Sequence, residues 1–498
     1  MAGPDTVRPV PVASRPRARA VGLALGPALA LAAWLALADD PVLTGPGRVT
    51  VSVAVLMATW WLTEAVPLAV TALLPATLFP VLGIADAAGA AAPYASPIVF
   101  LFLGGFVIGL AMEKVGLHRR IALHVLARVG TAPSRLVGGV MLVSAGLSMW
   151  ISNTATAIMM LPIGTSVLVS MREHMTEEPP PRLDDLGRAM MLGIAYGATI
   201  GGLGTLLGSP PNLVLASFLR ARYGVDLGMV EWLQVGLPVM VVMLPVAWLW
   251  LTRVAFRLPG GAAPGAGTMI ASELRALGPM RAGERRVLLV FTLAVVGWMS
   301  RPWIVAATGL RGLDDASIAL LAALALFAIP LDARARHFVI DWSTMTRLPW
   351  EVLILFGGGL SLAAAIAAHG VDGWLGAALQ VLAGLPALVI MAGVCTLVVF
   401  LTEVTSNTAV TTTLLPVVAA AAAGLGVPPA PLLGAVALSA SCAFMLPVAT
   451  PPNAVVFASG QVAVADMARA GLALNLVAIV VLTAYLGLAP GVLNRLGG

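Results

Sequence analysis

The sequence predicts an all-α polytopic membrane protein of about 11 transmembrane helices, built from two inverted repeats that each contain a re-entrant hairpin. Of its 498 residues, 59% are hydrophobic and only 10% are charged, whereas soluble domains carry about 25% charged residues. A polar tripeptide, Ser152-Asn153-Thr154, recurs in the second half as Ser406-Asn407-Thr408. The composition indicates a membrane protein, and the repeated tripeptide indicates an internal duplication.

The duplication extends beyond the tripeptide. Each copy is followed by a Pro-Pro-Asn motif, Pro210-Pro211-Asn212 in the first half and Pro451-Pro452-Asn453 in the second. Further residues keep the spacing of the tripeptides: Phe102, Gly104, Gly105, Gly116, Ser148 and Pro162 correspond to Phe356, Gly358, Gly359, Gly370, Thr402 and Pro416. A chance tripeptide would not carry its neighbours with it.

In the first half, apolar runs predict spans at 21–37, 49–62, 66–82 and 98–115. The stretch 136–171 is apolar but broken at 148–156, and at about 1.5 Å per residue it is too long for one crossing. We expect a re-entrant hairpin with Ser152-Asn153-Thr154 at its tip. A helix at 192–219, broken at Gly208-Ser209-Pro210-Pro211, and a span at 233–251 complete the half.

The second half repeats this plan. Spans are expected at 287–299, 316–328 and 352–368, then a hairpin over about 385–422, a helix at 432–457 broken at Ala449-Thr450-Pro451-Pro452, and a last span at 472–488. We therefore divide the chain into an N-terminal segment (1–20), a first repeat (21–256), a linker (257–283) and a second repeat (284–491).

Arginine residues orient the predicted helices. They concentrate in loops that lie on the same side as the N-terminus, at Arg119, Arg120, Arg128, Arg135, Arg253, Arg257, Arg275, Arg281, Arg285, Arg286, Arg334, Arg336 and Arg347. By the positive-inside rule, this side is cytoplasmic. We expect a multi-pass protein of the plasma or cell inner membrane, embedded in lipid, with a cytoplasmic N-terminus. The formal net charge of +5 then reflects loop orientation, and no nucleic-acid partner is expected.

The four breaks in the apolar sequence indicate a binding site. Unpaired backbone in lipid costs several kcal/mol, so such breaks persist only inside protein or along a wet cavity. Each repeat has an odd number of crossings, so the repeats run antiparallel and their tips can meet near the midplane. Hydroxyl, amide and carbonyl oxygens suit a hard cation such as Na+, and the N-termini of half-helices suit a carboxylate or another oxyanion.

This combination suggests cation-coupled anion transport. A channel is an alternative, because re-entrant hairpins also line pores. An enzyme is not expected, since no catalytic pair is visible. Glu403, whose counterpart in the first repeat is Met149, is an intramembrane carboxylate and hence a functional candidate, although solvation in a cavity or pairing would also explain it.

These motifs resemble those of the divalent anion/sodium symporter (INDY) family, and the resemblance covers nearly the whole chain. It rests on the two tripeptides and the two Pro-Pro-Asn breaks, with support from three further segments: Trp61-Leu62-Thr63-Glu64-Ala65-Val66-Pro67, Gly116-Leu117-His118-Arg119-Arg120 and Leu401-Thr402-Glu403. The resemblance implies a homodimer. It also implies an elevator mechanism, in which a transport domain (136–256 and 381–491) slides against scaffold helices (21–130 and 284–370).

The resemblance also implies the site residues. One Na+ would be held by Ser148, Ser152, Asn153 and the backbone of Gly208, and a second by Thr402, Ser406, Asn407 and the backbone of Ala449. The substrate would be held by Ser152, Asn153, Thr154, Ser406, Asn407, Thr408, Thr450 and Pro451. The function implied is Na+-coupled symport of a C4 dicarboxylate such as succinate, fumarate or malate. A Na+-independent dicarboxylate exchanger, or a carrier of citrate, sulfate or another oxyanion, is the alternative. Ser209 departs from the threonine that many relatives have there.

Overall fold

The computed structural model describes residues 16–173, 182–261, 263–310, 312–332, 337–378, 380 and 384–488. These residues are helical apart from loops and one short antiparallel pair of strands, β1 (Pro330–Asp332) and β2 (His337–Phe338). Eight helices in this part of the chain are long and apolar enough to span a membrane. The all-α class is confirmed. Most of the predicted N-terminal segment, 1–20, lies outside the described residues.

The first helices of the chain follow the predicted spans except at one point. They are α1 (Pro16–Ala36), α2 (Gly45–Thr63), α3 (Leu68–Thr71), α4 (Leu74–Val81), α5 (Ala87–Ala91), the 3-10 helix η1 (Ala92–Ala95), α6 (Pro97–Val115) and α7 (Leu117–Val129). The span expected at 66–82 is present but interrupted, because the chain breaks there between α3 and α4. Pro75, in the first turn of α4, has no N–H to continue a helix, and the carbonyl of Ala72 accepts from Tyr94 Oη.

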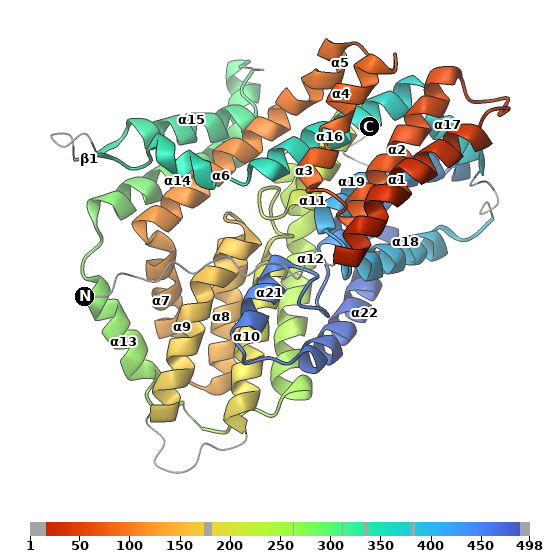
Figure 1. The fold of residues 1–498 in the computed structure, drawn as a ribbon. Helices are drawn as coiled ribbons and strands as arrows, with labels where there is room; N and C mark the ends of the chain where they lie inside the picture. The colour runs from red at the N-terminus through yellow and green to blue at the C-terminus, as the bar shows by residue number, and fades with distance from the viewer. Residues whose placement is uncertain are drawn as a thin grey trace.

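The first hairpin and the first broken helix have the predicted form. The hairpin arms are α8 (Pro133–Ser148) and α9 (Asn153–Glu173), the broken helix is α10 (Arg182–Gly201) with α11 (Pro210–Tyr223), and α12 (Met229–Leu249) continues into the π-helical turn η2 (Trp250–Ala255). Figure 1 shows α8, α9 and α10 side by side. Gly201 lets α10 approach α8, since a Cβ there would lie 2.3 Å from the carbonyl oxygen of Ala145.

The predicted linker, 257–283, contains the helix α13 (Ala266–Leu277). Its Ile270 is buried while Arg275 is exposed, and it packs against both α7 and α9. The segment therefore contributes to the packing of the first half, which its glycine-rich composition did not predict.

The second half contains the corresponding elements. They are α14 (Ala282–Thr308), α15 (Asp315–Ala328), the 3-10 helix η3 (Trp342–Arg347), α16 (Trp350–Ala368), α17 (Val371–Ala378), the hairpin arms α18 (Ala387–Thr402) and α19 (Asn407–Leu425), the broken helix α20 (Pro429–Ala440) with α21 (Pro451–Ala458), and α22 (Val464–Leu488). When α3 with α4 and each broken helix count as one crossing, the helices correspond to the 11 predicted spans.

The duplication also includes two short connecting helices that the sequence did not reveal. Gly116 ends α6 with φ of 77° and α7 begins at the next residue, and Gly370 has φ of 69° just before α17. Glycine adopts this left-handed conformation without strain, which explains why glycine stands at both positions.

The hydrophobic interior has two parts. The larger runs through the hairpins, the broken helices and the helices packed on them. The smaller lies between α2, α4 and α16, around Trp61, Phe79 and Leu362. The tip of each hairpin lies among these elements, at the start of α9 and of α19.

Candidate functional site

The tips of both hairpins line one cavity of 850 Å³. Every predicted substrate residue is on its wall: Ser152, Asn153, Thr154, Ser406, Asn407, Thr408, Thr450 and Pro451. The predicted backbone ligands Gly208 and Ala449 also line it, while Ser148 and Thr402 lie directly behind the tips and are fully buried. Residues from the two halves of the chain thus meet in one place.

Four helices begin at this cavity. Asn153 and Asn407 are the first residues of α9 and α19, and Pro210 and Pro451 are the first residues of α11 and α21. The N-terminus of a helix carries unpaired N–H groups and a partial positive charge of roughly half an elementary charge. Four such ends around one cavity favour an anion there, although no lysine or arginine belongs to the tips.

A cluster of oxygen atoms lies behind the first tip. One terminal atom of the Asn153 amide faces Ser148 Oγ and lies 3.0 Å from Gly208 O and 3.3 Å from Ala198 O. As nitrogen, that atom would donate to these oxygens. As oxygen, it would complete a group of four oxygens that share one hydroxyl proton, an arrangement that suits a cation.

The second tip has the same arrangement. Thr402 Oγ1 lies 2.6 Å from Asn407 Oδ1 and 2.9 Å from Ala440 O. One hydroxyl proton can serve only one of these acceptors at a time, so this group is also rich in oxygen and poor in protons. Ala440 ends α20, where carbonyl groups lack helical partners.

Ala198 and Ala440 were not among the predicted residues. Both contribute a backbone carbonyl, which any residue could supply, and the side chains carry no signal. Only their place in the chain could have indicated a role, because Ala198 lies near the end of α10 and Ala440 ends α20, the first segments of the two broken helices.

Two buried asparagines fix the breaks themselves. Asn212 Nδ2 donates to Gly202 O and Thr205 O, both at 2.8 Å. Asn453 Nδ2 donates in the same way to Ala443 O at 3.4 Å and Leu446 O at 3.0 Å. The Pro-Pro-Asn motif therefore starts the second half-helix with proline and ties the preceding loop with the amide.

A sequence profile of the family described as the sodium:sulfate symporter transmembrane region matches residues 27–489. The chain belongs to this family. It is 39% identical over 465 residues to the sodium-dependent dicarboxylate transporter SdcS of Staphylococcus saprophyticus, covering 93% of this chain and 89% of that protein. It is 38% identical over 472 residues to SdcS of Staphylococcus aureus strain USA300, covering 93% and 90%.

Two solved structures share the fold of this sodium:sulfate symporter family member. MtrF of Neisseria gonorrhoeae, described among antimetabolite efflux pumps, has a TM-score of 0.55 at 13% identity over 90% of this chain and 95% of that chain. The YdaH transporter of Alcanivorax borkumensis has a TM-score of 0.54 at 15% identity over 90% and 98%. The predicted family and polytopic transporter fold are confirmed.

Family membership makes the protein a multi-pass membrane transporter of a small anion and not an enzyme, as predicted. At the level of the family, the predicted coupling ion, Na+, is also confirmed. The assignment of individual residues to substrate and cation stays a prediction.

Ser209, in the first break, connects the two breaks. Its Oγ lies 2.9 Å from Ser441 Oγ, and both residues are buried. The hydroxyl of its counterpart Thr450 instead accepts from Asn453 N within its own helix end. The Ser209 hydroxyl therefore makes a contact between the two halves of the chain.

We expect Ser209→Ala to lower the free energy of unfolding by about 1 kcal/mol, because one buried hydrogen bond is lost. Thermal unfolding in detergent measures this effect. Ser441→Ala should have the same effect, and the double variant should be no worse than the sum of the two. A Ser209→Ala protein as stable as the wild type would show that the bond contributes nothing.

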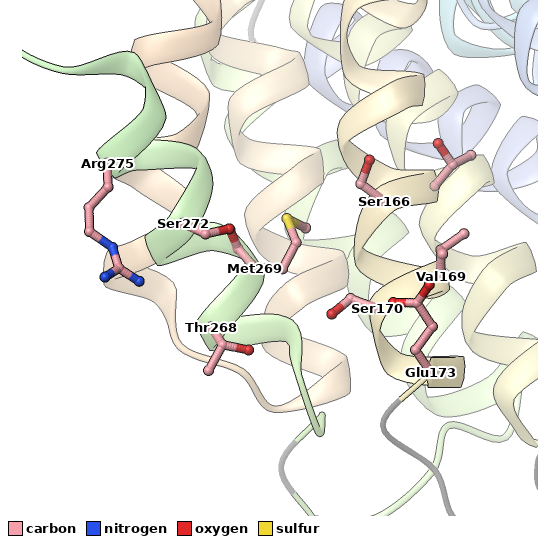
Figure 2. A pocket seen from close by; sticks show the side chains of 9 residues that line it. Ser166, Val169, Ser170, Glu173, Thr268, Met269, Ser272 and Arg275 are labelled. Atoms are coloured by element: carbon pink, nitrogen blue, oxygen red, sulfur yellow. The ribbon is translucent and has the colours of Figure 1, made fainter.

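A second cavity, of 560 Å³, lies between α9 and α13. Figure 2 shows its side chains on these two facing helices, including Ser166 and Glu173 on α9 and Ser272 and Arg275 on α13. None of the predicted substrate or cation residues lines it. It is separate from the cavity at the hairpin tips and plays no part in the proposed transport site.

Proposed function

We propose that this protein is a secondary active transporter that couples Na+ entry to symport of a C4 dicarboxylate such as succinate, fumarate or malate. One observation carries the proposal: two groups of oxygen atoms, around the amides of Asn153 and Asn407, stand directly behind four helix N-termini, and the hairpin tips at these helix ends bring no charged side chain to the cavity. The oxygens suit Na+, and the helix ends suit carboxylates.

The matched tips favour a substrate with two anionic ends. Each half supplies the same Ser-Asn-Thr group to the cavity, so two carboxylates can each bind one group. The relatives named as sodium-dependent dicarboxylate transporters support this choice. Sulfate is the second candidate, because the family description names it, and a Na+-independent exchanger is the alternative mechanism.

Uptake of labelled succinate into proteoliposomes, with and without an inward Na+ gradient, tests the proposal. Na+-dependent, saturable uptake that unlabelled fumarate and malate inhibit is expected. Uptake indifferent to Na+ but stimulated by internal dicarboxylate indicates an exchanger. Inhibition by sulfate instead of fumarate indicates the second candidate, and linear, non-saturable flux indicates a channel.

We further propose that transport occurs by an elevator motion in a homodimer, with residues 136–256 and 381–491 moving against residues 21–130 and 284–370. The cavity is consistent with this division, because the hairpin tips form one wall and residues of α2, α6 and α16 form the other, among them Leu62, Phe106 and Leu355.

The proposed orientation makes this state inward-facing. The cavity extends to Arg19, Glu64, Glu113 and Arg347, which lie at ends of α1, α2, α6 and η3 on the arginine-rich side of the protein. With the N-terminus in the cytoplasm, as the positive-inside rule predicts, substrate and Na+ would leave from here into the cell.

Two glycines of the proposed scaffold allow a test of the sliding motion. A Cβ at Gly105 would lie 2.6 Å from the side chain of Leu207, and one at Gly359 would lie 2.3 Å from that of Thr412. Both partners belong to the proposed moving part. We expect Gly359→Leu to reduce uptake about tenfold or more, because a larger side chain obstructs the sliding surface.

Gly105→Leu should behave in the same way, and in both variants Na+ and succinate should still raise the unfolding temperature. Gly146→Leu is the matched control, since that exposed glycine has no atom within 4 Å of a Cβ. Wild-type uptake by Gly105→Leu and Gly359→Leu would contradict the proposed sliding surface.

A further inference from the structure

Glu403 is a buried carboxylate that links a hairpin to the break of a helix. It follows Thr402 at the end of α18 and is 3% exposed. Its Oε1 accepts from Phe444 N at 2.7 Å and Met445 N at 2.9 Å, and its Oε2 accepts from Leu446 N at 3.0 Å. Three consecutive N–H groups of the break between α20 and α21 therefore converge on one side chain.

A fourth donor completes this arrangement. Asn475 Nδ2, on α22, donates to Glu403 Oε1 at 2.7 Å, and Asn475 Oδ1 accepts from Phe444 N at 3.2 Å. All four donors to Glu403 are uncharged. An ionised carboxylate can accept from all four donors at once without presenting an O–H to any of them.

The first repeat also links its hairpin to the break of its helix, but with a weaker interaction. There Met149 stands in place of Glu403, and its carbonyl oxygen accepts from Thr205 Oγ1, which lies in the first break. Thr205 occupies the position of Leu446, counted back from the Pro-Pro-Asn motifs. A neutral hydroxyl and a carbonyl do in the first repeat what a full charge and three N–H groups do in the second.

Glu403 is not itself available as a cation ligand, because its oxygens are occupied by these donors. Its effect reaches the oxygen cluster in two ways. It adjoins Thr402, whose Oγ1 lies against Asn407 Oδ1 and Ala440 O. It also places a negative charge in a region of low dielectric constant, where its attraction for a nearby cation is much stronger than in water.

We propose that Glu403 is a positioning residue for the second cation site: it holds the second break against the hairpin tip and supplies the negative charge that a cation among Thr402, Asn407 and Ala440 offsets. This inference rests on the proposed Na+ coupling. It assigns the two repeats unequal roles, with the second site binding Na+ more tightly than the first because only the second has a fixed carboxylate beside it.

The test is Glu403→Gln, which keeps the shape and removes the charge. In proteoliposomes, the Na+ concentration for half-maximal succinate uptake should rise about tenfold, a change of about 1.4 kcal/mol in binding. The KM for succinate at saturating Na+ should change less than about twofold. A merely structural role would lower the amount of folded protein without moving the Na+ dependence of the folded fraction.

Glu273→Gln, on the exposed surface of α13, is the matched control and should behave as the wild type. If Glu403→Gln does not fold, Asn475→Ser replaces it, since it removes one donor, keeps the carboxylate and should raise the half-saturating Na+ concentration about threefold. An unchanged Na+ dependence in the folded variant tested overturns the inference alone. A wild-type protein whose uptake and thermal stability ignore Na+ overturns the proposed coupling and the inference with it.

Discussion

Asn153→Ala and Asn407→Ala are each expected to abolish Na+-driven uptake while leaving the protein folded. Each change removes the side-chain amide, and with it the proposed cation ligand, from one of the two oxygen clusters. An interaction with a charged group is worth about 1.5–3 kcal/mol, so Na+ binding at the altered site should weaken about 10- to 100-fold. Loss of one coupled ion should then stop concentrative uptake, even where the other site still binds.

Uptake and thermal stabilisation by Na+ measure this effect together. The wild type should show a Na+-dependent rise in unfolding temperature, and each variant should show a smaller one, because a ligand stabilises the state that it binds. Thr405→Ala is the matched control, since Thr405 also lines the cavity but its hydroxyl donates to Leu401 O, in the last turn of α18, at 2.8 Å.

Normal uptake by either asparagine variant would show that the corresponding oxygen cluster is not a cation site. Loss of uptake in Thr405→Ala as well would indicate that any change near the tip disturbs the hairpin. The pair of variants also tests the duplication, because a chain with two functional copies of the motif should fail when either copy is altered.

The parts of the site that sequence predicts are those that depend on side-chain type. A polar tripeptide inside an apolar run is costly in lipid, so Ser152-Asn153-Thr154 and its repeat could be located, and proline in each break marked the start of α11 and α21. The duplication then supplied the expectation that both tips lie in one place, and both line the same cavity.

The parts that sequence does not predict depend on backbone atoms or on distant partners. The carbonyl groups of Ala198 and Ala440 carry no residue-specific signal. Glu403 was visible as an unusual charge, but its donors lie far along the chain at 444–446 and at Asn475. Nothing local indicates that they converge on it.

The helices of the fold were likewise predictable where they depend on residue type and unpredictable where they depend on packing partners. Long apolar runs gave most of the helices, whereas α7, α13 and α17 are short and form where packing requires them. The helix α13 shows this most clearly, because its composition is typical of a linker while its C-terminal carbonyl groups are held by an arginine from α7.

That arginine, Arg120, is expected to contribute most to stability among the polar side chains outside the cavity. It is 8% exposed and pairs with Glu284, which is 3% exposed, with Nε at 2.9 Å from Oε1 and Nη2 at 3.1 Å from Oε2. It also donates to the carbonyl oxygens of Gly278 at 2.9 Å and Pro279 at 3.3 Å. One side chain thus joins α7, the end of α13 and the first turn of α14.

Arg120→Met should lower the free energy of unfolding by about 3–5 kcal/mol, because it leaves the buried carboxylate of Glu284 without its partner. Arg120→Met with Glu284→Met should cost less than Arg120→Met alone, since no unpaired charge remains. Arg119→Ala, which removes only the exposed pair with Glu273, should cost less than about 1 kcal/mol. Equilibrium unfolding in detergent measures all three. If Arg120→Met costs no more than Arg119→Ala, the buried pair does not hold α13 and α14 against α7, and the apolar contacts of α13 with α7 and α9 must hold the linker helix in place instead.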